Sequence, residues 1–186
     1  PHPGGCVIGE RPIDLFLEGY ERMGASLEKV SDTFSLTLNR PRAVDFVFPV
    51  ISTTATMCLM MLASVAQGTS RLINAALEPE IVGLIKMLQK MGAIIELAPP
   101  RTVTIEGVSS LRGTRHRILP DRNEAVSFAC LAIATGGDIL VRGAVQEHLI
   151  TFLNAVRRIG ADYEVLPEGI RFRRTNGLKG TDIETA

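Results

Sequence analysis

The stretch IVGLIKMLQKMGAIIE, residues 81–96, decides the fold because it joins a helix signal to a strand signal across one glycine. The apolar residues that mark the helix are Ile81, Ile85, Leu88 and Met91. Their spacing of four, three and three residues places them on one face of an α-helix. Gly92 follows, and glycine tolerates the left-handed backbone that commonly ends a helix. The stretch therefore predicts an amphipathic helix that stops at Gly92.

The same pattern occurs three times, at intervals of 68 residues. The Gly-Ala pair at Gly92 recurs at Gly24 and Gly160, and an acid follows each alanine by three residues. The helix face recurs as Ile13, Leu17, Tyr20 and Met23 in the first copy, and as Leu149, Leu153, Val156 and Ile159 in the third. A fixed period of this length is typical of a chain built from repeated structural units.

Strand signals follow each glycine, because the apolar residues there alternate with polar ones. These residues are Phe34, Leu36 and Leu38, then Val103 and Ile105, then Ile170 and Phe172. Residues 55–66 and 123–134 read as buried helices closed by Gly68 and Gly136, and each leads into an apolar strand near residues 72–73 or 139–141. A unit is therefore helix, strand, helix, strand, strand, and the chain holds two full units and the back part of a third.

The units must pack against one another, because each has an amphipathic helix and a one-sided sheet that cannot bury themselves alone. We therefore expect an α+β fold in which the units stack through their helices. A solenoid is the alternative arrangement, and the periodicity by itself does not exclude it.

Composition places the chain among ordinary globular proteins. It is 46% hydrophobic and 22% charged, with 20 Lys and Arg against 20 Asp and Glu, so it lacks the cationic excess that non-specific nucleic-acid binding needs. Its most apolar stretch, residues 57–66, is well short of the roughly 20 residues that span a bilayer. Three cysteines do not suggest a disulfide framework. We expect a soluble, cytoplasmic protein without nucleic-acid or membrane partners.

The first unit differs from the others because it opens on a glycine-rich loop, PHPGGCVIGERP, residues 1–12. Its three glycines should leave Cys6 unshielded, and the cation of Arg11 would favour the Cys6 thiolate or hold an anionic group. Pro12 is suited to a helix start, so Arg11 would lie beside the positive end of a helix, a geometry that suits phosphate. A chance loop thiol is the alternative interpretation of Cys6.

A second anion-binding candidate is the Ser52-Thr53-Thr54 run that opens the next helix. These hydroxyls either cap free backbone N–H groups or leave them to a phosphate oxygen. In the repeat-related helix Asp121 caps the start and would repel an anion. Cys58 and Cys130 fall in apolar helical stretches, where we expect buried, unreactive thiols. No metal-ligand cluster or dinucleotide glycine pattern is present in the sequence, so we expect no metal and no cofactor.

These motifs together resemble the UDP-N-acetylglucosamine 1-carboxyvinyltransferases, enolpyruvyl transferases that open peptidoglycan precursor synthesis. The resemblance rests on residues 3–6 (PGGC), followed by Ile8-Gly9 and residues 11–14 (RPID). It continues in the family's order through residues 66–69 (AQGT), 74–76 (NAA), 78–82 (EPEIV) and 119–122 (LPDR). It covers essentially the whole chain, and the sister family of the shikimate pathway lacks this cysteine loop.

The resemblance implies an α/β prism, or inside-out α/β barrel, built from βαβαββ repeats of about 68 residues. Residues 1–119 would form the later part of the first domain, and residues 120–186 the first repeat of the second. The chain begins inside a loop, and about half of such an enzyme would lie outside it. We therefore expect the isolated chain to be inactive.

The resemblance also implies roles for particular residues. Cys6 would be the general acid that protonates the methylene carbon of phosphoenolpyruvate, and Arg11 would hold the phosphate of this substrate. The uridine of UDP-N-acetylglucosamine would contact Pro12, Ile13, Asp14 and Leu15. Its diphosphate would contact Val50, Ile51, Ser52 and Thr53. The chain departs from the family at Val50, where the family commonly has a lysine.

Two other functions stay open at the level of sequence. A non-catalytic repeat module that binds a nucleotide sugar or a protein partner would fit Val50 and the absent segments. An RNA-phosphate cyclase would need a nucleotidyl-accepting histidine, and His2, His116 and His148 do not lie in suitable loops.

Overall fold

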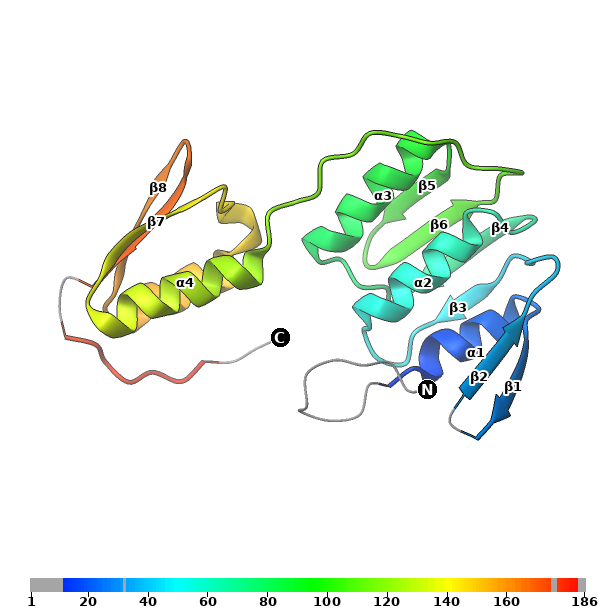
Figure 1. Ribbon diagram of the computed structural model, residues 1–186, viewed down its shortest axis with the longest axis horizontal. Helices are drawn as coiled ribbons and strands as arrows, with labels where there is room; N and C mark the ends of the chain where they lie inside the picture. Colours follow the sequence, from blue (N-terminus) through cyan, green and yellow to red (C-terminus); the bar gives the residue numbers. More distant parts are fainter. Residues whose placement is uncertain (1–11, 32, 175–176, 184–186) are drawn as a thin grey trace. The chain divides into compact units, whose positions relative to one another are not determined.

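The computed structural model describes residues 12–31, 33–174 and 177–183. The chain divides into two compact units, residues 1–117 and 118–186, and Figure 1 shows their elements. The division follows Arg117, whereas the resemblance implies a boundary after residue 119. Within the described ranges no helix is long and apolar enough to cross a membrane.

The first unit contains three helices and six strands among its described residues. In chain order they are α1 (Asp14–Arg22), β1 (Ser26–Val30), β2 (Thr33–Thr37), β3 (Asp45–Val47), α2 (Thr53–Ala63), β4 (Thr69–Ile73), α3 (Pro79–Met91), β5 (Ile94–Ala98) and β6 (Thr102–Glu106). The second unit contains α4 (Arg122–Thr135), β7 (Asp138–Arg142), a 3₁₀ turn η1 (Gln146–His148), α5 (Ile150–Arg158), β8 (Asp162–Leu166) and β9 (Gly169–Arg173). The mixture of helices and sheets confirms the α+β class.

The predicted repeat is confirmed element by element. The series α2, β4, α3, β5, β6 recurs as α4, β7, α5, β8, β9, and α1, β1, β2 form the back part of a third unit. The sheets repeat as well, because the order β4-β6-β5 matches β7-β9-β8 and every pair in both is antiparallel. Gly24, Gly92 and Gly160 follow the ends of equivalent helices with φ of 102°, 106° and 85°. Only glycine adopts this backbone without steric cost.

Strand β3 is an element that the sequence analysis missed. It pairs in parallel with β4, so the first unit carries a four-stranded sheet of order β3-β4-β6-β5 and a complete βαβαββ series. Three residues are too few to give a reliable alternating pattern. The signal that was available is the pair of aromatic residues Phe46 and Phe48, two positions apart, which are both buried and pack edge to face.

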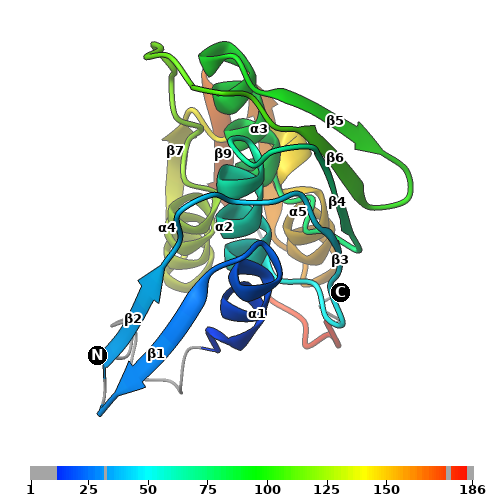
Figure 2. The same cartoon turned by 90° about the vertical axis from the view of Figure 1, so that its right-hand side faces the viewer.

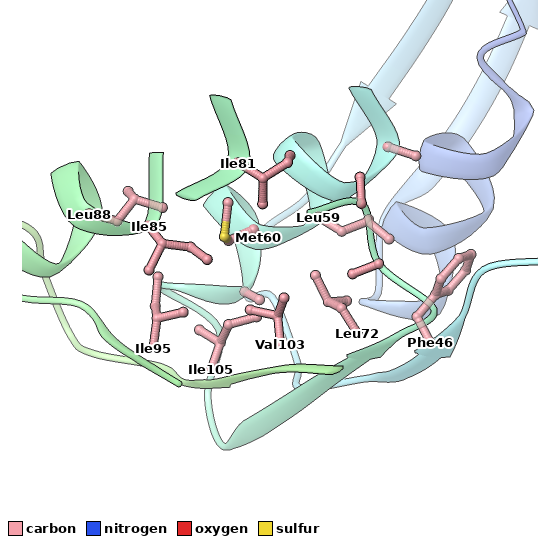
Figure 3. Close-up of a cluster of buried hydrophobic side chains, with 14 of the residues drawn as sticks. Phe46, Leu59, Met60, Leu72, Ile81, Ile85, Leu88, Ile95, Val103 and Ile105 are labelled. Atoms are coloured by element: carbon pink, nitrogen blue, oxygen red, sulfur yellow. The ribbon is translucent and has the colours of Figure 1, made fainter. Parts of the chain in front are cut away.

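The core of the first unit lies between this sheet and the helices that cover one of its faces (Figure 3). Leu59 and Met60 of α2 point towards the strands, beside Ile81 of α3. Leu72 and Val103 meet them from β4 and β6, and all five side chains are fully buried. Burying a large apolar side chain contributes roughly 1.5–3 kcal/mol, so α2 is held mainly by this packing.

Helix α2 ends earlier than the sequence predicted. Its last helical residue is Ala63, and Gly68 instead precedes β4. The Ser64 hydroxyl donates to the Met60 carbonyl at 2.9 Å, and the Ala66 N–H bonds the carbonyl three residues back at 3.1 Å. Bonds over three residues tighten a helix end into a turn. The apolar residues beyond Ala63 therefore form a turn that leads into β4.

Helix α4 in the second unit is less buried than its sequence predicted. Ala125 and Ala129 pack against the sheet, where Ile170 and Phe172 are fully buried. Phe128, on another face of the helix, is 52% exposed, and the nearby Leu131 is 57% exposed. The prediction of a wholly buried helix is wrong for this chain, because the described part of the second unit supplies a sheet on one side of α4 only.

The hairpin of β1 and β2 lacks a third strand among the described residues. It forms a two-stranded sheet, whereas the equivalent hairpins pair with β4 and β7. Leu36 faces Leu27 in the register in which Ile105 faces Ile95, yet Leu36 is 38% exposed and Ile105 is fully buried. A two-stranded sheet is marginally stable by itself.

We expect the backbone amides of the β1–β2 hairpin to exchange with deuterium faster than those of the β5–β6 hairpin. Both hairpins have five paired positions, so the comparison isolates the effect of the third strand. Exchange of the native chain, followed peptide by peptide with mass spectrometry, measures it. Equal protection of the two hairpins would show that the lone hairpin is as stable as the paired one.

Candidate substrate-binding site

The predicted site residues of the described chain lie at the starts of two helices, α1 and α2. Cys6 and Arg11 lie outside the described residues. Helix α1 packs on α2, and the two lie side by side in both views (Figure 1, Figure 2). The structure therefore brings the residue 12–15 segment and the residue 50–53 segment onto neighbouring helices of one unit.

The start of α1 leaves two predicted contact residues accessible. Pro12 and Asp14 are exposed, whereas Ile13 and Leu15 are half-buried and Leu15 packs on the core. Ile13 is the N-cap and its carbonyl accepts the Leu17 N–H at 3.1 Å, without a side-chain cap. The helix begins two residues after Pro12. Pro12 and Asp14 are thus free to meet a ligand while Leu15 anchors the segment.

The start of α2 is capped by serine, as the sequence predicted. The Ser52 side chain accepts the Ala55 N–H at 3.3 Å, which satisfies one of the free donors of the first turn. Val50 is 61% and Ile51 is 46% exposed, so both flank the helix start from the solvent side. Thr53 is half-buried as the first helical residue.

The first turn of α2, like that of α5, contains no acidic residue. The first turns of α1, α3 and α4 contain Asp14, Glu80 and Glu124, whereas that of α2 contains no acid. Asp121, the N-cap of α4, itself accepts the Asn123 N–H at 2.7 Å, as predicted. The partial positive charge of a helix N-terminus favours anions, and a nearby carboxylate cancels it. The starts of α2 and α5 are therefore more favourable for a phosphate than those of α1, α3 and α4, and of the two predicted site segments only residues 50–53 lie at such a start.

A buried threonine fixes the start of α2, and the sequence analysis missed it. Thr56 is fully buried, and its hydroxyl donates to the Ser52 carbonyl at 2.8 Å while accepting the Ala76 N–H at 3.1 Å. Asn74, in a left-handed conformation with φ of 60°, donates its side-chain N–H to the Phe48 carbonyl at 2.9 Å. The residue 74–76 motif therefore holds the turn before α2 from both sides.

Tyr20 and Cys58 mark the contact between α1 and α2. Tyr20 is half-buried, and this burial, followed by the neighbouring Cys58 thiol, raises the pKa of Tyr20 to about 12. Burial disfavours the phenolate, so the hydroxyl stays protonated at neutral pH. Cys58 is itself half-buried, less buried than the sequence predicted.

Cys130 contradicts the prediction of a buried thiol, because it is exposed on α4. It lies near Phe128 and Leu131 on the part of α4 that the sheet does not cover. The prediction assumed that a helix apolar on all sides is covered on all sides. Because Cys130 is accessible, accessibility by itself does not distinguish Cys6 from the other two thiols. Within the described ranges, no group of three or more His, Cys, Asp or Glu side chains could hold a metal ion.

The sequence is similar to proteins named UDP-N-acetylglucosamine 1-carboxyvinyltransferase. Relatives of this name from Chelativorans sp. (strain BNC1) and Rhizobium meliloti (strain 1021) are each 45% identical to the chain over an alignment of 186 positions that covers 98% of the chain. One from Mesorhizobium japonicum is 44% identical over 99% of the chain. The chain spans only 43–44% of the length of these relatives.

The family model for EPSP synthase (3-phosphoshikimate 1-carboxyvinyltransferase) matches residues 2–186. Among solved structures, the enolpyruvyl transferase NikO from Streptomyces tendae aligns with a TM-score of 0.79 and 21% identity, over 90% of this chain and 43% of that one. EPSP synthase from Acinetobacter baumannii aligns with a TM-score of 0.70 and 18% identity, over 94% of this chain and 42% of that one. These alignments support the inside-out α/β fold over a solenoid.

We expect Thr56→Val to destabilise the chain by about 1–3 kcal/mol, because the buried Ala76 N–H loses its acceptor. Thr54→Val is the matched control, since Thr54 is exposed in the same turn of α2. Urea unfolding of both variants measures the difference. If the two lose equal stability, the Thr56 hydroxyl does not hold the start of α2.

We expect iodoacetamide to alkylate Cys130 faster than Cys58 in the native chain, because Cys130 is exposed and Cys58 is half-buried beside Tyr20. Mass spectrometry of the proteolysed chain after brief labelling gives both rates. Labelling in urea is the control, and there the two rates should converge. Faster reaction of Cys58 in the native chain would contradict the exposure of α4.

Proposed function

The chain belongs to the EPSP synthase family, and we propose that it is part of an enzyme that acts on phosphoenolpyruvate and UDP-N-acetylglucosamine. The enzyme would transfer the enolpyruvyl group to the 3-hydroxyl of the sugar and release phosphate. The observation that carries this proposal is the 45% identity, over 98% of the chain, to relatives named for this reaction. The solved structures at 18–21% identity support the fold alone.

The proposed reaction is an addition followed by an elimination. Cys6 would give a proton to the methylene carbon of phosphoenolpyruvate, which makes the neighbouring carbon electrophilic. The sugar hydroxyl would attack that carbon and lose its proton. Departure of phosphate and removal of a proton from the new methyl group would then restore the double bond. We assign the base for these deprotonations to no residue of this chain.

The two helix starts would hold the nucleotide sugar. Exposed Pro12 and Asp14, with Ile13 and Leu15, would contact the uridine, and Arg11 would contact the phosphate of phosphoenolpyruvate. The residue 50–53 segment would contact the diphosphate, supported by the absence of an acid in the first turn of α2. Val50 supplies no cation, so backbone N–H groups and hydroxyls would carry this contact.

We also propose where this chain lies in the enzyme. Residues 1–119 would be the later part of one enolpyruvyl transferase domain, and residues 120–186 the first repeat of the next. The repeat of sheet order in β4-β6-β5 and β7-β9-β8 supports equivalent units on both sides of this boundary. The remaining segments of the longer relatives would complete the site, so the chain alone would not turn over.

A chimera tests the proposal. Residues 1–186 replace the matching part of the Rhizobium meliloti relative, to which they are 45% identical. We expect the chimera to release phosphate only when both substrates are present, and Cys6→Ala to slow this at least about 100-fold, as expected for loss of a general acid. Cys130→Ser is the control and should keep the rate, because Cys130 is placed in no substrate contact.

Two results would contradict the proposed function. A folded chimera that binds both substrates without releasing phosphate would indicate a binding module instead of an enzyme. Full activity of the Cys6→Ala chimera would remove Cys6 from the proposed chemistry. The isolated chain in the same assay should release no phosphate.

A further inference from the structure

We propose that the contact between Gly19 of α1 and Leu59 of α2 is a positioning contact, which sets the spacing between the two segments that would hold UDP-N-acetylglucosamine. The inference rests on the proposed function, which assigns residues 12–15 to the uridine and residues 50–53 to the diphosphate. One end of the ligand would then be held by α1 and the other by α2.

The contact leaves no room for a side chain at position 19 of α1. Gly19 is buried in the middle of the helix, and a Cβ there would lie 2.5 Å from Leu59 Cδ1 and 2.9 Å from Leu59 Cγ. Leu59 is fully buried among the core side chains (Figure 3), so it has little freedom to turn away. An added methyl group must therefore move α1 away from α2 or distort the core.

The glycine is unfavourable for the helix itself. Glycine in a helix interior costs roughly 0.5–1 kcal/mol relative to alanine. The equivalent positions 68 and 136 residues later are Met87 of α3 and Ala155 of α5, which both carry side chains. The repeat itself therefore does not require a glycine at this position. The close approach of α1 to α2 explains why one is present in α1.

Neighbouring contacts fix the rotation of α1 around this point. Phe16 packs edge to face on Tyr20, with ring centroids 5.9 Å apart, and both rings pack on the core cluster. Tyr20 also lies beside Cys58, the residue before Leu59 on α2. The contact at Gly19 sets the distance between α1 and α2, and these rings set the rotation of α1 about its own axis. The starts of the two helices are therefore held in a fixed position relative to each other.

This rigidity matters because one ligand would bridge both starts. A ligand that is held at two points binds well only when the spacing of the two points matches it. In catalysis, a misplacement of about 1 Å can cost roughly 100-fold in rate, and we expect a ligand held at two points likewise to lose affinity when their spacing changes. A ligand held by α1 alone does not sense the spacing. Position 19 should therefore act on the whole nucleotide sugar and leave binding of uridine unchanged.

The test uses Gly19→Ala in the full-length chimera described above. We expect the affinity for UDP-N-acetylglucosamine to fall about tenfold or more, while the affinity for uridine stays within about twofold. Isothermal titration calorimetry measures the first ligand and ligand-observed NMR measures the second. Glu21→Ala is the matched control, because Glu21 is an exposed residue of the same helix, and it should change neither affinity.

A second variant shows whether the effect passes through Leu59. Gly19→Ala combined with Leu59→Ala makes room for the methyl group, so the double variant should recover most of the affinity for UDP-N-acetylglucosamine. Thermal unfolding of the same proteins should show Gly19→Ala lowering Tm although alanine favours helix, with the double variant falling by less than the sum of the single changes.

The outcomes separate the two proposals. Equal loss of both ligands, no loss of either, or no recovery in the double variant would overturn the positioning role while leaving the proposed function intact. An unsubstituted chimera that folds but binds neither ligand would overturn the proposed function, and the positioning role with it.

Discussion

The burial of α2 against the four-stranded sheet is the interaction on which the first unit depends. Leu59 and Met60 fill the space above Leu72 and Val103, so the helix is held at a fixed height over the strands. Helices α1 and α3 then pack on α2, and the turn before α2 is held by Thr56 and its partners. The start of α2 is therefore placed by the core, and any ligand held there would depend on that core for its geometry.

The need to cover an apolar central helix also explains why that helix is more exposed in the second unit than in the first. In both, apolar residues of the central helix face a sheet whose three equivalent strands have the same order, β4-β6-β5 and β7-β9-β8. In the first unit α1 and α3 also cover α2. In the second unit α4 has α5 and the sheet, and Phe128 and Leu131 are left more than half exposed. An apolar helix surface of this kind is typical of a face that packs against further protein.

Much of the fold could be predicted from the sequence because helix and sheet faces have fixed periods. The spacing of Ile81, Ile85 and Leu88 predicted helix α3, and Gly92 predicted its end. The interval of 68 residues predicted the two equivalent helices, α1 and α5. Strand β3 could not be predicted in the same way, since three residues are shorter than the pattern needs. The exposed side of α4 could not be predicted either, because a sequence records which residues are apolar and not which neighbours are present to cover them.

The helix starts at which we propose the site were predictable from local signals, whereas the contacts that support them were not. Serine and aspartate caps are local signals, and both Ser52 and Asp121 act as predicted. The roles of Thr56 and Asn74 depend on groups 20 and 26 residues away, and no local pattern reveals them. Residue Gly19 belongs to the same class, because its function depends on Leu59, which is distant in sequence and adjacent in space.

The residues around the start of α2 also define how an anion would be held there. Exposed Val50 and Ile51 bring no charge, so long-range attraction to a diphosphate would be weaker than at a site with a lysine. Affinity in such a site depends on close fit more than on charge. A site of that kind requires exact spacing between its two helices, and the packing of Gly19 on Leu59 provides a rigid means of setting it.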